Sequence, residues 1–207
     1  MRLVIIGAGG HGRVLAECAK AAQLQLLGFV DDNTALTGTS QLDLPILGTI
    51  AALEKKLVLG EGILLGIGNS AFRMRLLHAF RAAQFGVPTL IHPRAWVSPS
   101  ASCGAGTVVM ANATVQTGCR LGEGVIINTN ASVDHDSVVS DGVHICPGAH
   151  LAGNVTVGEG TFIGIGASVI PSIRIGKGCL IAAGAVVIRD VPDGQRIAGV
   201  PASLMAK

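Results

Sequence analysis

The feature that most constrains the fold of this chain is a six-residue repeat of aliphatic side chains that runs from Ile91 to Val187. Counting in sixes from Ile91 to Val187, sixteen of the seventeen positions hold Ile, Leu or Val, and the seventeenth is Cys103. The residue four places after each is small or β-branched throughout. Because an α-helix repeats its face every 3.6 residues and a strand every 2, neither explains a period of six. The pattern predicts a chain that turns a corner every six residues, with three sides making a coil of 18 residues and each coil pairing with the next as parallel strands do.

The composition agrees with a narrow interior. The 207 residues include 29 glycines, and 49% are apolar although only 3% are aromatic. Such a core has to be thin and regular, because Phe and Trp are the side chains that normally fill wide gaps between layers. Glycines recur directly after the aliphatic positions and again two residues further on, where we expect corners that need a positive φ or close backbone contact. The glycines of the first kind are Gly104, Gly122, Gly158, Gly164 and Gly176.

Three stretches of the repeat, LGEGVI, VGEGTF and IGKGCL, resemble the hexapeptide-repeat acyltransferases. The resemblance covers residues 91 to about 190. It implies a left-handed parallel β-helix, and the handedness comes from the family because parallel crossovers are normally right-handed. We therefore expect residues 91–207 to form a β-helix acetyltransferase domain with a C-terminal tail.

Residues 1–90 follow a different pattern, in which apolar runs alternate with helix-like segments. The expected strands are residues 3–7, 26–30 and 63–68, and the expected helices are residues 12–23, 49–56 and 71–84. This alternation is typical of a small parallel α/β sheet. The predicted fold is therefore a small Rossmann-like α/β domain followed by the β-helix.

A glycine motif lies between the first expected strand and helix. Gly7, Gly9 and Gly12 spell G-x-G-x-x-G, and Asp31 and Asp32 end the second strand. Such glycines let backbone N–H groups approach an anion at a helix N-terminus, and an acidic residue can accept from a ribose hydroxyl or a base N–H. A domain of this size holds one nucleotide-binding half, which favours a mononucleotide over a dinucleotide. The alternative is a tight strand-to-helix turn without a ligand.

Over nearly the whole chain, GAGGHGRV, FVDDN, GIGNSAFR, LIHPRAWVSPSA, VDHD and AGVPA resemble, in order, the bacterial nucleotide-aminosugar N-acetyltransferases. This group includes the bacillosamine-pathway enzymes and the related sialic acid O-acetyltransferases. The resemblance implies an N-terminal domain that holds the UDP part of a UDP-4-amino-sugar, and acetyl-CoA in a cleft between the β-helices of a homotrimer. The residues that it places at the diphosphate and sugar are Gly7, Gly9, Gly10, His11 and Gly12, with Asp31 and Asp32 near uridine.

Acyl transfer from a thioester to an amine needs a base, donors for the oxyanion and aligned substrates. Histidine is the natural base near neutral pH. His135 lies between Asp134 and Asp136, where carboxylates on both sides can fix its tautomer and stabilise the imidazolium. The family resemblance likewise makes His135 the general base and Asp136 the carboxylate that orients it. We expect His92 and His150 to be surface residues.

Counting along the coil places three further residues. Gly153 follows His135 by one coil, so its N–H lies roughly 5 Å away and is a candidate donor to the thioester carbonyl. His144 follows by half a coil, which puts it on the opposite side of the prism, on the order of 15 Å from His135. Because the resemblance gives His144 a function too, we expect the two histidines to meet across subunits of a trimer. Asn128 either bonds the substrate or only caps a corner.

Other chemistries are less consistent with the sequence. Cys146 could carry the acetyl group covalently, but nothing around it promises a lowered pKa, so we expect direct attack. Sugar O-acetylation with the same base is the closest alternative activity. A zinc site of the carbonic anhydrase kind from His135, His144 and His150 needs three ligands at one point, and the flanking acids argue against a metal. A catalytically silent scaffold is the remaining alternative.

Charge and apolar patterning limit the partners. A net charge of +2 with 14% charged residues provides no basic surface for nucleic acid. Apolar stretches stay short of the roughly 18 residues that span a bilayer, and the first residues lack the layout of a cleavable signal. Five scattered cysteines without a C-x-x-C pair argue against a disulfide framework. We expect a soluble cytoplasmic enzyme that binds a nucleotide-sugar, acetyl-CoA and copies of itself.

Overall fold

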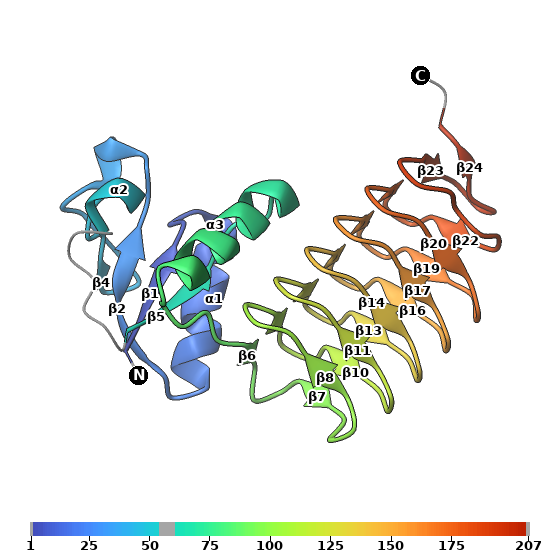
Figure 1. The fold of residues 1–207 in the computed structure, drawn as a ribbon, viewed down its shortest axis with the longest axis horizontal. Coiled ribbons are helices and arrows are strands. Elements are labelled where there is room, and N and C mark those ends of the chain that lie inside the picture. The colour runs from blue at the N-terminus through green and yellow to red at the C-terminus, as the bar shows by residue number, and fades with distance from the viewer. Residues whose placement is uncertain (1, 54–60, 206–207) are drawn as a thin grey trace. The chain divides into compact units, whose positions relative to one another are not determined.

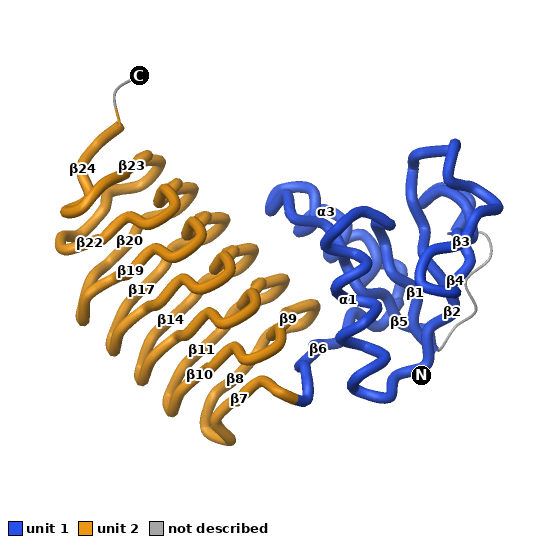
Figure 2. Tube along the Cα trace, turned by 180° about the vertical axis from the view of Figure 1, so that it is seen from behind, with its two compact units in different colours: residues 1–93 blue, residues 94–207 orange. Residues whose placement is uncertain are grey.

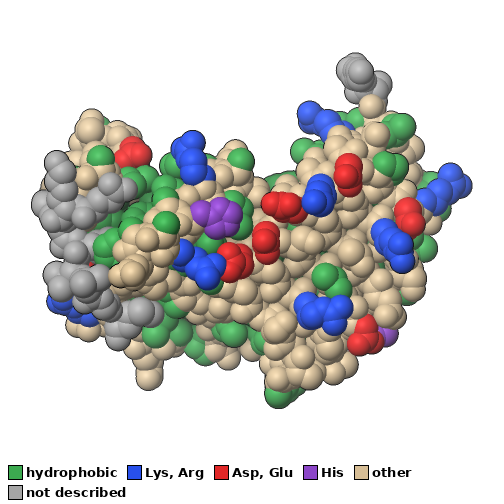
Figure 3. Space-filling view, viewed as in Figure 1, with side chains coloured by type: hydrophobic (Ala, Val, Ile, Leu, Met, Phe, Trp, Pro, Cys, Tyr) green, Lys and Arg blue, Asp and Glu red, His purple; other side chains and the backbone are tan. Residues whose placement is uncertain are grey.

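The computed structural model of the chain describes residues 2–53 and 61–205. The chain divides into two compact units, Met1–Pro93 and Arg94–Lys207, which Figure 2 draws in different colours. Among the described residues, none of the helices combines the length and the apolar character needed to cross a bilayer. On the face drawn in Figure 3, the Lys and Arg side chains of the described residues are interspersed with Asp and Glu and form no continuous basic patch.

The first unit is built on a three-stranded parallel sheet in the order β2-β1-β5. Its strands are β1 (Arg2–Ile6), β2 (Gln25–Val30) and β5 (Gly62–Leu65). All of β5 and the last four residues of β1 are buried, as expected for a parallel sheet that is covered on both faces. Val4 and Ile6 belong to the same apolar cluster as Leu77 of α3 (Ser70–Ala82), and α1 (Gly10–Ala21) contacts β1 and β2.

The fold predicted for this unit is confirmed, with element ends displaced by a few residues. Strand β5 stops at Leu65, and a Cβ on the following Gly66 would lie 2.6 Å from the Gly12 Cα. Of the helix expected over 49–56, the structure describes α2 (Ile50–Leu53), and residues 54–56 lie outside the described residues. Three short elements were not predicted: the 3-10 helix η1 (Thr34–Leu36) and the paired strands β3 (Ser40–Gln41) and β4 (Leu44–Pro45). Strand β6 (Leu90–Ile91) ends the unit.

The second unit is a parallel β-helix, as the six-residue repeat predicted, and each coil contributes one short strand to each of three faces (Figure 1). The first face consists of β7 (Trp96–Val97), β10 (Thr114–Val115), β13 (Ser132–Val133), β16 (His150–Leu151), β19 (Ser168–Val169) and β22 (Val186–Val187). The second face consists of β8 (Ser102–Cys103), β11 (Arg120–Leu121), β14 (Val138–Val139), β17 (Thr156–Val157) and β20 (Arg174–Ile175). The third face consists of β9 (Val108–Val109), β12 (Ile126–Ile127), β15 (His144–Ile145), β18 (Phe162–Ile163), β21 (Leu180–Ile181), β23 (Arg196–Ala198) and the antiparallel β24 (Ser203–Leu204).

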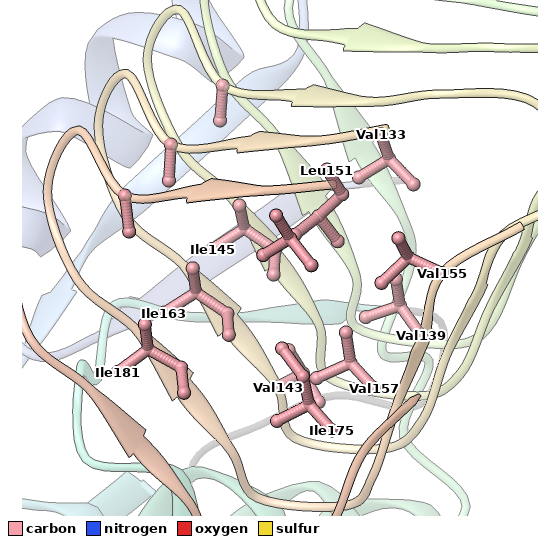
Figure 4. Close-up of a cluster of buried hydrophobic side chains, with 14 of the residues drawn as sticks. Val133, Val139, Val143, Ile145, Leu151, Val155, Val157, Ile163, Ile175 and Ile181 are labelled. Carbon is pink, nitrogen blue, oxygen red and sulfur yellow. The ribbon is translucent and has the colours of Figure 1, made fainter. Parts of the chain in front are cut away.

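The register of the coils is 18 residues, as predicted. Val115 pairs with Val133, and Val133 pairs with Leu151 on the next coil. The second residue of each strand from β7 to β23 points into the prism, where Val133, Val139 and Ile145 from the three faces of one coil meet (Figure 4). These three side chains are at most 1% exposed. The aliphatic residues of successive coils therefore form the thin, regular core that the composition predicts.

The corners of the coil have one conformation throughout. From residue 106 to residue 184, every sixth residue has a positive φ between 57° and 70°. Most of these residues are glycines, but Asn112, Asn130, Asp136, Asn154 and Ser172 occupy the remaining corners. Asn and Asp tolerate this left-handed conformation better than other side chains do. The glycine column at position 104 has the other expected cause, because a Cβ there would lie 2.6 Å from the Gly122 backbone on the next coil.

Candidate active site

His135 and Asp136 lie at the corner between β13 on the first face and β14 on the second. The Nδ1 atom of His135 is 2.9 Å from Oδ2 of Asp136. Because an ionised carboxylate only accepts hydrogen bonds, Nδ1 carries the proton and Nε2 keeps its lone pair in the neutral ring. Asp136 is also one of the corner residues with a positive φ, 58°. A single residue thus forms the turn and orients the imidazole.

Asp134 makes a different contact from the one that its position suggested. Its Oδ1 accepts from the backbone N–H of His135 at 2.7 Å, so only Asp136 of the two flanking acids contacts the ring. The pKa of His135 is raised, mainly by the hydrogen bond to Asp136 and further by the negative charges of both acids, while desolvation acts against them. The ring is half exposed. The arrangement makes His135 an accessible base that is stronger than an ordinary histidine.

Gly153 is the neighbour of His135 on the next coil. Ser132 pairs with His150 in the strands that precede them, and the N–H of Asn154 donates to the carbonyl of His135 at 2.8 Å. A Cβ on Gly153 would lie 2.5 Å from Cε1 and 3.0 Å from Cδ2 of the His135 ring. The imidazole therefore fills the space that a side chain at position 153 would need.

His144 and Asn128 form a second polar pair, apart from His135. His144 begins β15 on the third face, which lies opposite the corner that holds His135. Its Nε2 is 3.1 Å from Nδ2 of Asn128, and its ring meets that of Phe162 edge to face with centroids 5.2 Å apart. Asn128 also accepts the N–H of Thr129 at 2.8 Å, which caps its own corner. The structure thus joins Asn128 to His144 and separates both from His135 within one chain.

The other candidate residues of the β-helix have local partners. His150 is exposed, and its Nδ1 is 2.9 Å from Ser132 Oγ on the first face, while His92 is half-buried. The three histidines of the zinc alternative therefore lie at a corner, on the first face and on the third face, without a common point. Burial raises the pKa of the Cys146 thiol to about 12, which leaves it protonated and unsuited to carry an acetyl group.

In the first unit, the glycine motif forms a tight turn between β1 and α1. Gly7 has φ +97°, and its N–H donates to Val30 at 2.7 Å. A Cβ on Gly12 would collide with the Gly7 carbonyl, whereas Gly9 and Gly10 have open space around them. Gly9 caps α1 without a side-chain hydrogen bond. The first N–H groups of α1 therefore lie at a helix N-terminus that no side chain caps, which is a suitable place for an anion.

Asp31 and Asp32 hold the backbone around this turn. Asp31 accepts the N–H of Ala8 at 2.8 Å through Oδ2 and that of Asn33 at 2.9 Å through Oδ1. Asp32 accepts the N–H of Ile50 at 2.9 Å, at the start of α2. Sequence reasoning assigned both acids to the ligand, and the structure adds a positioning role for each.

Arg73 is a residue that sequence reasoning missed. This α3 side chain is only 1% exposed, and its Nη1 donates to the carbonyls of Ile67 and Gly68 at 2.9 and 3.0 Å. Burial lowers the pKa of Arg73 to about 10, and burial together with the Arg73 charge lowers the pKa of His11 to about 4. His11 is therefore neutral near pH 7. The available signal was an arginine in helical register with the apolar Leu77 and Phe80.

Both units match known proteins. Residues 2–80 match the model of the PglD N-terminal domain, and residues 154–189 match that of the bacterial transferase hexapeptide, six repeats. The chain is 43% identical to the acetyltransferase domain of PglB from Neisseria gonorrhoeae FA1090, with a TM-score of 0.93 and 99% of each chain covered. A further structure of that domain is a complex with acetyl coenzyme A.

A second relative is PerB from Caulobacter crescentus, whose structure contains CoA and GDP-perosamine. It is 38% identical to this chain with a TM-score of 0.94, and the match covers 100% of this chain and 98% of PerB. A search of curated proteins found no match. The family expected from the sequence motifs is confirmed by identities of this size over whole chains. The protein belongs to the hexapeptide-repeat acetyltransferases that carry a PglD N-terminal domain.

Proposed function

We propose that this enzyme transfers the acetyl group of acetyl-CoA to the 4-amino group of a nucleotide-linked amino-sugar, with His135 as the general base. The observation that carries the proposal is the hydrogen bond between His135 and Asp136, 2.9 Å long, in a chain whose relatives were solved with acetyl coenzyme A or with CoA and GDP-perosamine. We propose UDP as the nucleotide, and the GDP-sugar in PerB makes GDP the first alternative to test.

The reaction proceeds by direct attack. The neutral amine of the sugar attacks the thioester carbonyl carbon, so that a C–N bond forms and the C–S bond then breaks. The proton that the amine nitrogen loses passes to Nε2 of His135, and the departing CoA sulfur finally takes it up. Asp136 accepts from Nδ1–H throughout and stabilises the imidazolium that forms.

Gly153 supplies a donor for the oxyanion of the tetrahedral intermediate in this mechanism. Within the described residues, the Gly153 N–H donates no hydrogen bond, whereas the N–H groups of Ala152 and Asn154 donate to the carbonyls of Val169 and His135. A free N–H beside the base can therefore point to the thioester oxygen. Such donors stabilise charge that develops only in the transition state.

The nucleotide-sugar is bound by the first unit in this proposal. The N–H groups of Gly10, His11 and Gly12 at the start of α1 receive the diphosphate, and neutral His11 contacts the sugar as a hydrogen-bonding group without competing charge. Asp31 and Asp32 lie near the nucleoside. Because each carboxylate oxygen has two lone pairs, both acids can hold the backbone and still accept from a ribose hydroxyl or a base N–H.

We further propose that the active enzyme is a homotrimer with sites between subunits. The separation of His144 and Asn128 from His135 within one chain supports this arrangement. In the trimer, His144 and Asn128 of one subunit face His135 of the next and help to hold acetyl-CoA and the acceptor.

The test is a CoA-release assay with UDP-, dTDP- and GDP-linked 4-amino-sugars, each paired with the corresponding 4-hydroxy sugar. We expect turnover of an amino-sugar, and a fall of at least about 10² in turnover for His135→Ala. Turnover of a hydroxy sugar alone would replace the proposal with O-acetylation. Full activity of the His135→Ala variant would show that His135 is not the general base.

A further inference from the structure

We propose that Gly118 is a positioning residue for acetyl transfer, because the absence of a side chain at this corner makes room for the Asp136 carboxylate that holds His135. The inference rests on the proposed function and extends it to a residue that touches neither substrate. Gly118 lies one coil before Asp136 in the same column of corners, as Gly153 lies one coil after His135.

The contact concerns the far end of the Asp136 side chain. A Cβ on Gly118 would lie 2.5 Å from Oδ1 and 3.5 Å from Cγ of Asp136. Carbon and oxygen atoms that are not bonded approach to about 3.3 Å at closest, so Oδ1 could not stay in place. Oδ2, which accepts from His135 Nδ1 at 2.9 Å, belongs to the same rigid carboxylate and would move with it.

The backbone around Gly118 cannot easily yield instead. The Gly118 N–H is held by Ser100 Oγ at 3.2 Å, and the Asp136 N–H donates to the Thr117 carbonyl at 3.0 Å. The same Cβ would be 3.6 Å from the Asp136 backbone nitrogen, an ordinary contact. An added methyl group therefore displaces the carboxylate and leaves the coil as it is.

Backbone conformation alone does not require glycine at position 118. Its φ is +70°, and equivalent corners are occupied by Asn112, Asn130 and Asn154, whose φ values are 58°, 57° and 59°. At Gly178, whose φ is +60°, a Cβ would meet nothing within 4 Å. Gly178 thus shares the left-handed conformation of Gly118 without the contact to a carboxylate. This difference provides a matched control.

The experiment compares Gly118→Ala with Gly178→Ala in the full-length enzyme, since both variants carry the same kind of backbone strain. For Gly118→Ala we expect a kcat about tenfold lower or more, KM values within about twofold of the parent, and an acid limb of the pH profile that moves to lower pH. The Gly178→Ala variant should retain the kinetics of the parent. Equal kinetics of the two variants would overturn the inference.

A double-mutant cycle tests whether Gly118 acts through Asp136. Asp136→Gly removes the carboxylate and suits the positive φ of this corner. In that background, Gly118→Ala should lower kcat by less than about twofold, because the displaced group is already absent. A further loss as large as in the parent enzyme would show that Gly118 acts by another route.

Histidine NMR separates this inference from the proposed function. The pKa of His135 should fall toward the ordinary value in Gly118→Ala and stay raised in Gly178→Ala, whatever the substrate is. If the pKa falls but His135→Ala keeps full activity, the general-base mechanism is wrong and Gly118 still positions Asp136. If the pKa of His135 is unchanged in Gly118→Ala, the inference is wrong.

Discussion

The ring of His135 occupies the space beside Gly153 in which any other residue would place its Cβ, 2.5 Å from Cε1. The contact joins two residues one coil apart in the same column. It keeps one side of the imidazole against the backbone of Gly153. The relationship between these two residues defines the centre of the proposed site.

Replacing Gly153 by alanine should therefore abolish most of the activity without unfolding the chain. Position 153 is not among the residues with a positive φ, so alanine suits its backbone, but the methyl group must push the His135 ring away. We expect kcat to fall by about 10² or more, the scale of a general base. Kinetics together with a thermal melt checks this prediction, and a variant that melts normally with full activity would contradict it.

The pH profile should report the bond between His135 and Asp136. The raised pKa of His135 means that the neutral base is lost as the pH falls through that pKa. Asp136→Asn keeps a side chain that tolerates the corner but removes the charge, so the pKa of His135 drops and the acid limb of kcat/KM moves to lower pH. The plateau should fall by up to about 10⁴. An acid limb that stays in place would argue that another group titrates.

Subunit sharing should be visible as complementation between two inactive variants. In a mixture of His135→Ala and His144→Ala subunits, some interfaces pair an intact His135 with an intact His144 from the next chain. We expect co-expressed variants to recover activity that neither has alone. Oligomers that form but stay inactive in the mixture would place both histidines of a site in one subunit, contrary to the proposal.

His11 should stay neutral well below neutral pH. Its pKa of about 4 lies below that of an unfolded histidine, so the unfolded chain binds the proton first as the pH falls. The contribution of His11 to stability is full above about pH 6.5 and declines between pH 6.5 and 4, by roughly 3 kcal/mol. Histidine NMR measures the midpoint directly. Arg73→Met should raise it, while Arg75→Met, an exposed arginine on the same helix, should leave it unchanged.

The repeat made the β-helix predictable because inward positions such as Val133 and Ile145 recur at a fixed interval without insertions. The same regularity predicted that Gly153 is next to His135, since columns are set by counting. Counting along the chain did not predict the pairing of Asn128 with His144. It depends on how side chains tilt out of neighbouring coils, which a count along the chain does not describe.

The first unit was less predictable at the level of single contacts. Its glycine motif predicted a turn at the start of a helix, which is found, but not that Asp31 would hold that turn through Ala8. The β3–β4 hairpin was missed because its turn uses Leu42 and Asp43 at positive φ, in place of the usual Asn-Gly or Gly-Gly. Buried Arg73 was missed because its register with Leu77 and Phe80 was the only sign of burial, and an arginine is rarely enclosed.

The uniform corner conformation has a consequence for how this site can change. Each side of the coil has six residues, and no loop interrupts the chain between His135 and Gly153. The distance between these two residues is therefore set by the number of residues that separate them. Loss of a whole coil beyond Gly153 would shorten the prism and leave this contact intact. Insertion of a single residue between them would shift every later residue by one position in the coil, so that side chains of the core would face outward. Insertions or deletions between Gly118 and Gly153 are therefore the length changes that should abolish the reaction.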